Sequence, residues 1–167
     1  MDLIQKAKLM LPNMPDEVFN KWLLPIIKDH NSWPYNNVFS QHPSLQWKRY
    51  FSLFDLNDIS NCQWNKSQLS FDQWCLDTVS NKTIAALIQS NTNPFSTVTF
   101  NVRDTKARFF GFVKEIQNTG KIPAPIIVLH TDDGLRILDG NHRLSALTYL
   151  RLRGQISCET WFGYPNV

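Results

Sequence analysis

The residues with the greatest potential for chemistry lie in one short run, Leu138-Asp139-Gly140-Asn141-His142-Arg143. The run follows a predicted strand and leads straight into a predicted helix. Backbone N–H groups without an intrahelical acceptor therefore meet the positive end of a helix dipole at one point. Phosphate binds favourably at such a point. The run predicts an anion-binding site of the kind that holds nucleotides.

Each side chain of this run suits one part of phosphate chemistry. Gly140 has no Cβ, so the backbone can turn sharply and an anion can approach closely. Asn141 and His142 supply short-range donors, and Arg143 supplies a bidentate, permanently charged contact to phosphate oxygens. Asp139 supplies the carboxylate that a magnesium-bound nucleotide or a hydroxyl nucleophile needs. We expect Asp139 and His142 to be catalytic, with Asp139 also the Mg²⁺ ligand.

A purely structural interpretation of the same residues stays open. In that interpretation Asp139 caps the helix, Gly140 is an ordinary turn residue, and Arg143 pairs with an acid on the surface. The run then needs no ligand.

Hydrophobic patterning predicts the elements that position the run. The predicted strands are 96–102, 126–129, 135–138 and 156–162, and the predicted helices are 107–118 and 144–154. The sequence Asp132-Asp133-Gly134 predicts a hairpin between the second and third of these strands.

The N-terminal half has helical patterning instead. A helix opens at Met14-Pro15-Asp16-Glu17, and Pro25 either kinks it or ends it early. Residues 30–44 have loop composition, and Ser70 with Gln73 has the spacing of a capping box before a further helix. The turn-rich residues 91–94 are the predicted boundary. We expect an α+β protein with a helical N-terminal region (1–90) packed on a small mixed-sheet domain (95–167).

Residues 120–128, the short hairpin after them and the run 138–147 resemble the ParB/sulfiredoxin superfamily. Gly140, Arg143 and Ala146 match its Gly-x-x-Arg-x-x-Ala loop, and the similarity covers 97–162, under half of the chain. The resemblance implies a mixed-sheet domain whose loop binds the phosphates of ATP or CTP. It also favours Arg103, after the first predicted strand, as a second phosphate contact, and a solvated charge on the surface is the alternative interpretation of this residue.

The branch of the superfamily matters for the expected activity. Sulfiredoxins carry their catalytic cysteine directly after the loop glycine, where this sequence has Asn141, so reduction of peroxiredoxin is not expected. The Asp-Gly-x-x-Arg form resembles branches that phosphorylate free serine or hydrolyse NTPs. The resemblance therefore implies a Mg²⁺-dependent NTP hydrolase or phosphotransferase.

Two other functions stay open. In one the same loop grips the scissile phosphate of DNA and Asp139 holds the metal of a nuclease, as in an inhibitor of plasmid DNA transfer. In the other the protein is a non-catalytic interaction module that uses its aromatic N-terminal half, around 33–47, to bind a protein partner.

Composition limits these functions only loosely. The chain has a net charge of +3, which permits a nucleic-acid partner without arguing for one. Its cysteines, Cys62, Cys75 and Cys158, lack metal-ligand spacing and are predicted to be reduced thiols. No stretch approaches the roughly 18 apolar residues of a membrane span, and the first residues lack a signal peptide's pattern. We expect a cytoplasmic protein without membrane contact.

Overall fold

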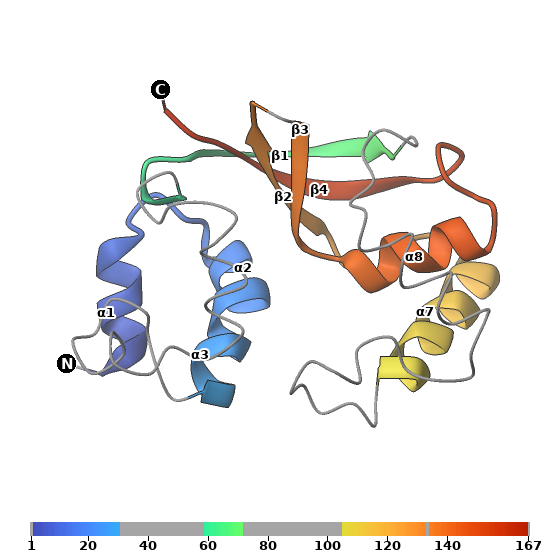
Figure 1. Ribbon diagram of the computed structural model, residues 1–167, viewed down its shortest axis with the longest axis horizontal. Coiled ribbons are helices and arrows are strands. Elements are labelled where there is room, and N and C mark those ends of the chain that lie inside the picture. The colour runs from blue at the N-terminus through green and yellow to red at the C-terminus, as the bar shows by residue number, and fades with distance from the viewer. Residues whose placement is uncertain (1, 31–58, 72–104, 133, 167) are drawn as a thin grey trace.

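The computed structural model describes residues 2–30, 59–71, 105–132 and 134–166, which form helices and one sheet (Figure 1). The helices whose bounds are described are α1 (Leu3–Met10), α2 (Asp16–Val18), the π-helical segment η1 (Phe19–Leu23), α3 (Leu24–His30), α7 (Thr105–Thr119) and α8 (Asn141–Tyr149). The strands are β1 (Gln63–Ser70), β2 (Ile126–Thr131), β3 (Gly134–Asp139) and β4 (Ser157–Tyr164).

The sheet is mixed, with strand order β1-β4-β2-β3. β2 pairs antiparallel with β3 and parallel with β4, and β4 pairs antiparallel with β1. Because helices and a mixed sheet occur in one chain, the predicted α+β class is confirmed.

Most predicted elements of the C-terminal part are confirmed. Helix 107–118 is α7, and the strands predicted at 126–129, 135–138 and 156–162 are β2, β3 and β4. Thr131 pairs with Gly134, so β2 and β3 form the predicted hairpin. Helix α8 begins at Asn141, earlier than predicted, and ends at Tyr149. The strand predicted at 96–102 and the boundary at 91–94 lie outside the described residues.

Strand β1 corrects the prediction of a helical region from 1 to 90. All eight residues of Gln63–Ser70 pair with β4, from Gln63 opposite Tyr164 to Ser70 opposite Ser157. Ser70 therefore ends a strand. The strand is mostly exposed and mostly polar, and it contains Asn and Lys, residue types with low strand propensity. Its conformation comes from pairing along the edge of β4, which local sequence does not reveal.

Two groups of helices cover opposite faces of the sheet, because side chains alternate along β2. Ile127 and Leu129 belong to a core cluster with α1, η1 and α3, which includes Ala7, Phe19, Trp22, Leu23 and Ile27. Ile126 and Val128 belong to a second cluster with α7 and α8, which includes Phe109, Ile116, Leu144 and Leu147. Figure 1 shows α1–α3 on one side of β2 and β3 and α7–α8 on the other.

The helical chain from Asp16 to His30 passes through Pro25 instead of ending there. Just before the proline it is π-helical, and the N–H of Leu24 donates to the carbonyl of Phe19. Proline cannot donate a backbone hydrogen bond and crowds the preceding turn. A wider π-helical turn at this place accommodates both effects.

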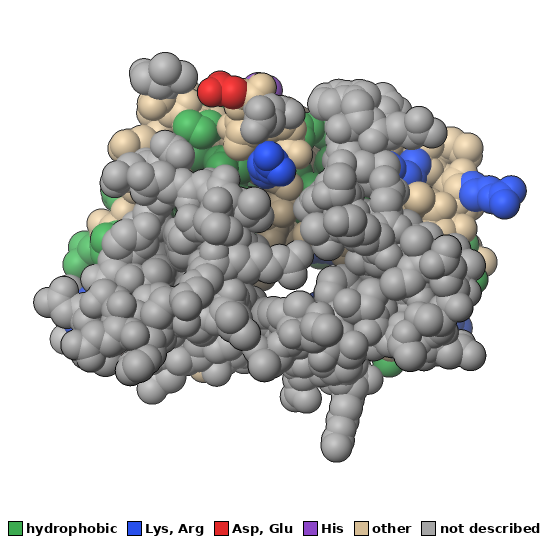
Figure 2. All heavy atoms as spheres, in the orientation of Figure 1, with side chains coloured by type: hydrophobic (Ala, Val, Ile, Leu, Met, Phe, Trp, Pro, Cys, Tyr) green, Lys and Arg blue, Asp and Glu red, His purple; other side chains and the backbone are tan. Residues whose placement is uncertain are grey.

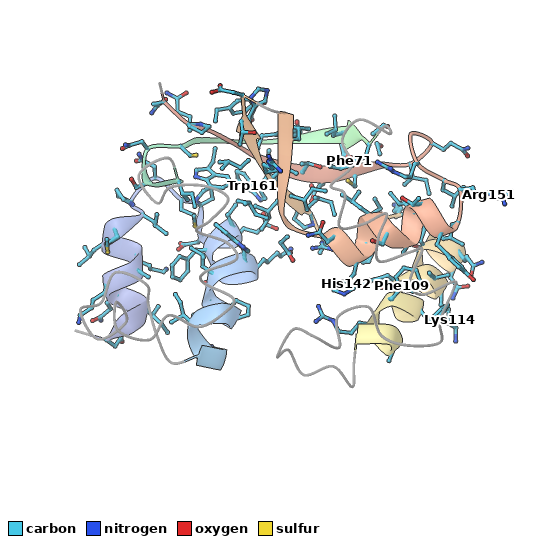
Figure 3. All side chains as sticks on the ribbon, viewed as in Figure 1. Phe71, Phe109, Lys114, His142, Arg151 and Trp161 are labelled. Atoms are coloured by element: carbon cyan, nitrogen blue, oxygen red, sulfur yellow. The ribbon has the colours of Figure 1, made fainter. Side chains whose placement is uncertain are left out.

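A polar contact joins α2 to the sheet. Glu17 Oε2 accepts hydrogen bonds from Trp161 Nε1 (2.9 Å) and Lys66 Nζ (3.0 Å), and Glu17 Oε1 lies 3.1 Å from Lys21 Nζ. Figure 3 labels Trp161, a residue of β4. The hydrogen bond from Trp161, followed by the one from Lys66, lowers the pKa of Glu17 to about 2 from its ordinary 4.5. The ionised Glu17 is therefore a tether between α2, β1 and β4.

We expect this tether to make stability depend on pH. The folded pKa of Glu17 is depressed, so its contribution is complete above pH 4.5 and is lost as the pH falls toward 2. We predict that Glu17→Gln lowers the free energy of unfolding by about 1–2 kcal/mol at pH 7, a value reduced for solvent screening of a carboxylate that is a third exposed. Urea unfolding at pH 7 and pH 2.5 should show the two proteins converging at the lower pH.

The matched control is Asp16→Asn, since Asp16 pairs with Lys8 but is 79% exposed. We expect its effect to stay within about 0.5 kcal/mol. A Glu17→Gln protein that follows wild type at both pH values would contradict the tether.

Three further predictions concern membrane spans, the cysteines and the aromatic N-terminal segment. No described helix combines the length and apolar character needed to cross a membrane. Cys62 and Cys158 are buried, unbridged thiols. Cys75 and the aromatic segment 33–47 lie outside the described residues, so the predicted protein-binding region is not placed.

Candidate functional site

The junction between β3 and α8 is built around Gly140. Its backbone has φ 112° and ψ 8°, and its carbonyl accepts the first bond of α8 from the N–H of Leu144 (3.0 Å). L side chains rarely adopt this φ. A Cβ at this position would also lie 2.4 Å from Cδ1 of Ile126, a fully buried residue of β2. The junction thus requires glycine for its conformation and for its close approach to β2.

The N-terminus of α8 has an electropositive character. Gly140 provides no side-chain cap, and no acidic residue lies in the first turn. The N–H groups of Asn141, His142 and Arg143 belong to the first turn, where backbone donors have no intrahelical acceptor. With the helix dipole they give this point a partial positive charge that suits an anion.

Arg143 is buried below this turn, with 6% of its surface exposed. Its NH1 donates to the carbonyls of Pro125 (2.8 Å) and Pro123 (3.2 Å), and its NH2 donates to Oδ2 of Asp139 (2.6 Å). The guanidinium therefore fixes the 120–125 loop, the end of β3 and α8 relative to one another.

Asp139 is the last residue of β3 and lies one turn before Arg143. Its side chain is 37% exposed, against 8% for Arg143. The charge-assisted pair therefore has a buried guanidinium and a carboxylate that still reaches solvent. The structural interpretation left open by the sequence expected Arg143 to pair with an acid on the surface. The pair with Asp139 is present, but the guanidinium is buried.

Asn141 and His142 are half-buried residues of the first turn of α8. Figure 3 labels His142 at the start of that helix, and its Nε2 atom is buried. The consecutive residues Asp139 to Arg143 thus span the end of β3 and the first turn of α8. Arg103 lies outside the described residues.

The sequence did not indicate the carbonyls of Pro123 and Pro125 as partners of the site. The segment 122–125 has no regular structure, so its carbonyls are not used by a sheet or helix. A signal did exist, because two prolines so close together exclude a helix and favour an extended connection with free acceptors.

Cys158 lies on β4, and its Sγ is 3.5 Å from Oγ1 of Thr160. Burial raises the pKa of this thiol, and the opposing effects of the Thr160 contact and the Arg143 charge are smaller. A thiol with a raised pKa holds little thiolate and is a poor nucleophile. Cys158 is therefore not a candidate nucleophile.

The residues present suit a metal ion only in part. Among the described residues no group of three His, Cys, Asp or Glu side chains could hold a metal. Mg²⁺ usually keeps several waters and binds through one or two carboxylates together with substrate phosphates. Asp139, with one oxygen paired to Arg143, fits as a single such carboxylate and not as a complete binding site.

Comparison of this chain with models of known protein families, with curated proteins and with solved structures finds no match in any of the three.

Proposed function

We propose that this protein binds a nucleoside triphosphate, ATP or CTP, with its phosphates at the N-terminus of α8, in the manner of a ParB/sulfiredoxin-like domain. The observation that carries the proposal is Gly140, which starts α8 at φ 112° without a side-chain cap. An uncapped helix start places the positive end of the helix dipole at this point, which favours an anion.

The contacts of Arg143 refine the role expected from the sequence. Its NH1 is used by two loop carbonyls and its NH2 by Asp139. We propose that its positive charge adds to the field at the helix end and that its hydrogen bonds hold the loop in place. Direct binding of phosphate then falls to the backbone N–H groups, Asn141 and His142, with Arg103 as the proposed second contact.

Asp139 is the proposed catalytic carboxylate. It is partly exposed and lies directly before Gly140, so it can reach a group bound at the helix end. There it would act as a general base toward water or a hydroxyl acceptor, or as one ligand of the nucleotide's Mg²⁺. Arg143 orients this carboxylate through the 2.6 Å contact. The reaction proposed is hydrolysis or transfer of the terminal phosphoryl group.

The test is calorimetric titration of ATP, CTP and GTP with Mg²⁺, followed by measurement of phosphate release. We expect Asp139→Asn to keep nucleotide binding and to lose phosphate release by about 10²–10⁴-fold, the usual contribution of a general base. We expect His142→Ala to weaken binding by about 10-fold or more, the loss of a hydrogen bond to a charged group. Asp132→Asn makes the same chemical change at an exposed residue of the β2–β3 turn and should leave both unchanged.

The result decides between the functions left open by the sequence. Absence of binding for all three nucleotides would sink the proposal. Cleavage of plasmid DNA that requires Mg²⁺ and disappears in Asp139→Asn would replace it with the nuclease function. Binding without phosphate release in wild type would restrict the protein to nucleotide binding.

A further inference from the structure

Two exposed aromatic rings lie together on the outer surface of α7 and α8. Phe110 and Tyr149 are each 41% exposed, and their ring centroids are 6.1 Å apart at an interplanar angle of 88°. Both also contact Phe109 edge-on, at 5.2 and 5.6 Å, and Phe109 is fully buried. The exposed rings are therefore held in fixed orientations by the core.

Positively charged residues lie close in sequence to these rings. Lys114 follows Phe110 by four residues on α7, so the two lie on the same side of that helix, and Arg151 follows Tyr149 by two residues. Both are exposed, and Figure 3 labels them at the end of the molecule where Figure 2 shows Lys and Arg side chains at the edge. Arg108 and Lys121 are further exposed cations in 105–121. Glu115 is the only acidic residue within 105–121 and 141–156.

This aromatic and basic surface, formed by Phe110, Tyr149, Lys114 and Arg151, is distinct from the start of α8. Tyr149 is the last residue of α8 and His142 is in its first turn. Seven residues of helix separate them by roughly 10 Å along the axis. A ligand at one place does not need the other.

We propose that this surface binds single-stranded nucleic acid. Lys114 and Arg151 would contact backbone phosphates, while Phe110 and Tyr149 would stack against unpaired bases, whose faces are available only when the strand is single. The cations match the charge of the strand, and the exposed rings explain why a single strand fits better than a duplex, which offers phosphates alone. Binding would not depend on the base sequence of the strand, because every base has a face that can stack on an aromatic ring.

The experiment measures fluorescence anisotropy of a labelled oligothymidine of about 12 nucleotides, within the site sizes known for such surfaces, at two salt concentrations. We expect Phe110→Ala to weaken binding about fivefold or more, through loss of stacking. We expect Lys114→Glu to weaken it and to reduce the salt slope by about 0.7, the contribution of one phosphate contact to a single strand. Arg151 has φ 58°, so Arg151→Asn is the suitable neutral variant there.

The matched control is Lys28→Glu, which makes the same change in net charge on α3, an exposed part of the other helical group. Thermal unfolding of each variant checks that it folds. Loss of binding in Phe110→Ala and Lys114→Glu with retention in Lys28→Glu supports the proposal.

Four results would overturn it. The first is that wild type does not bind the oligonucleotide, and the second is that Lys28→Glu and Lys114→Glu lose binding equally. The third is that wild type binds a duplex of the same length as tightly and Phe110→Ala binds the oligonucleotide as well as wild type does. The fourth is Phe110-dependent binding to vesicles containing phosphatidylserine without binding to the oligonucleotide. The last result would assign the surface to an anionic membrane.

Discussion

Replacing Gly140 with alanine is expected to lower the free energy of unfolding by about 3 kcal/mol. One part is backbone strain, since a left-handed conformation costs an L residue about 1–2 kcal/mol. The other part is crowding, since the new Cβ would lie 2.4 Å from Cδ1 of Ile126 and 3.1 Å from its Cγ2. Ile126 is fully buried, and overpacking of a core costs about 1–3 kcal/mol. Urea unfolding monitored by tryptophan fluorescence measures the sum.

A second substitution separates the two parts. Ile126→Val removes the Cδ1 atom that the new Cβ meets most closely, so the double variant Gly140→Ala/Ile126→Val should recover most of the crowding part and retain the backbone strain. Gly111→Ala is the control, because nothing lies within 4 Å of its added Cβ and it is inside α7. We expect Gly111→Ala to be neutral or to stabilise by up to about 1 kcal/mol.

The outcome also tests why glycine starts α8. If Gly140→Ala unfolds at the wild-type midpoint, the junction tolerates a side chain and glycine there is needed only for a ligand. If stability falls as expected, Gly140 is required by the fold even without nucleotide.

The elements that the sequence predicted best are those with regular hydrophobic spacing and clear breakers. Helix α7 was predicted within two residues at each end because Gly120 and Pro123 limit it on one side. The start of α8 was predicted too late. Its first turn carries Asn141 and His142, polar residues that hide the hydrophobic period, which resumes at Leu144.

Strand β1 could not be predicted because its stability is not local. Gln63–Ser70 shows the burial of an edge strand, mostly exposed, and its backbone pairs with a strand more than eighty residues away in sequence. Its inward contacts are few, with only Trp64 and Leu69 partly buried. An edge strand rich in polar residues and lysine gives little periodic signal.

The composition of the candidate site was predictable and its internal contacts were not. Adjacency alone places four polar residues and a glycine at a strand–helix junction. It cannot show that Arg143 reaches carbonyls 18 and 20 residues earlier, because that contact depends on how the 120–125 loop passes α8. From its side-chain chemistry we expected the guanidinium of Arg143 to bind a ligand. In the folded protein it donates hydrogen bonds to two loop carbonyls and to Asp139.

Arg143 therefore carries the other large expected effect. We expect Arg143→Ala to lower the free energy of unfolding by about 3 kcal/mol in the absence of nucleotide, since removing one partner of a buried ion pair costs about 3–5 kcal/mol. The lower value applies because Asp139 is 37% exposed and can be rehydrated. The buried carbonyl of Pro125 would lose its 2.8 Å donor as well. Arg143→Lys keeps the charge but cannot reproduce the fork of NH1 and NH2, so we expect it to lose about 1–2 kcal/mol.

Three controls distinguish this structural role from binding of phosphate. Arg108→Ala removes an exposed arginine from α7 and should change stability by no more than about 0.5 kcal/mol. The double variant Asp139→Asn/Arg143→Ala should show a coupling of about 0.5–3 kcal/mol with the single variants, as residues in direct contact do. If Arg143 served only a ligand, Arg143→Ala would match wild type in nucleotide-free unfolding and show no coupling to Asp139. The structural role predicts that Arg143→Ala loses stability, that its effect is coupled to Asp139, and that the more stable variant Arg143→Lys still binds nucleotide. In that case the guanidinium holds the loop, and phosphate is recognised by the start of α8.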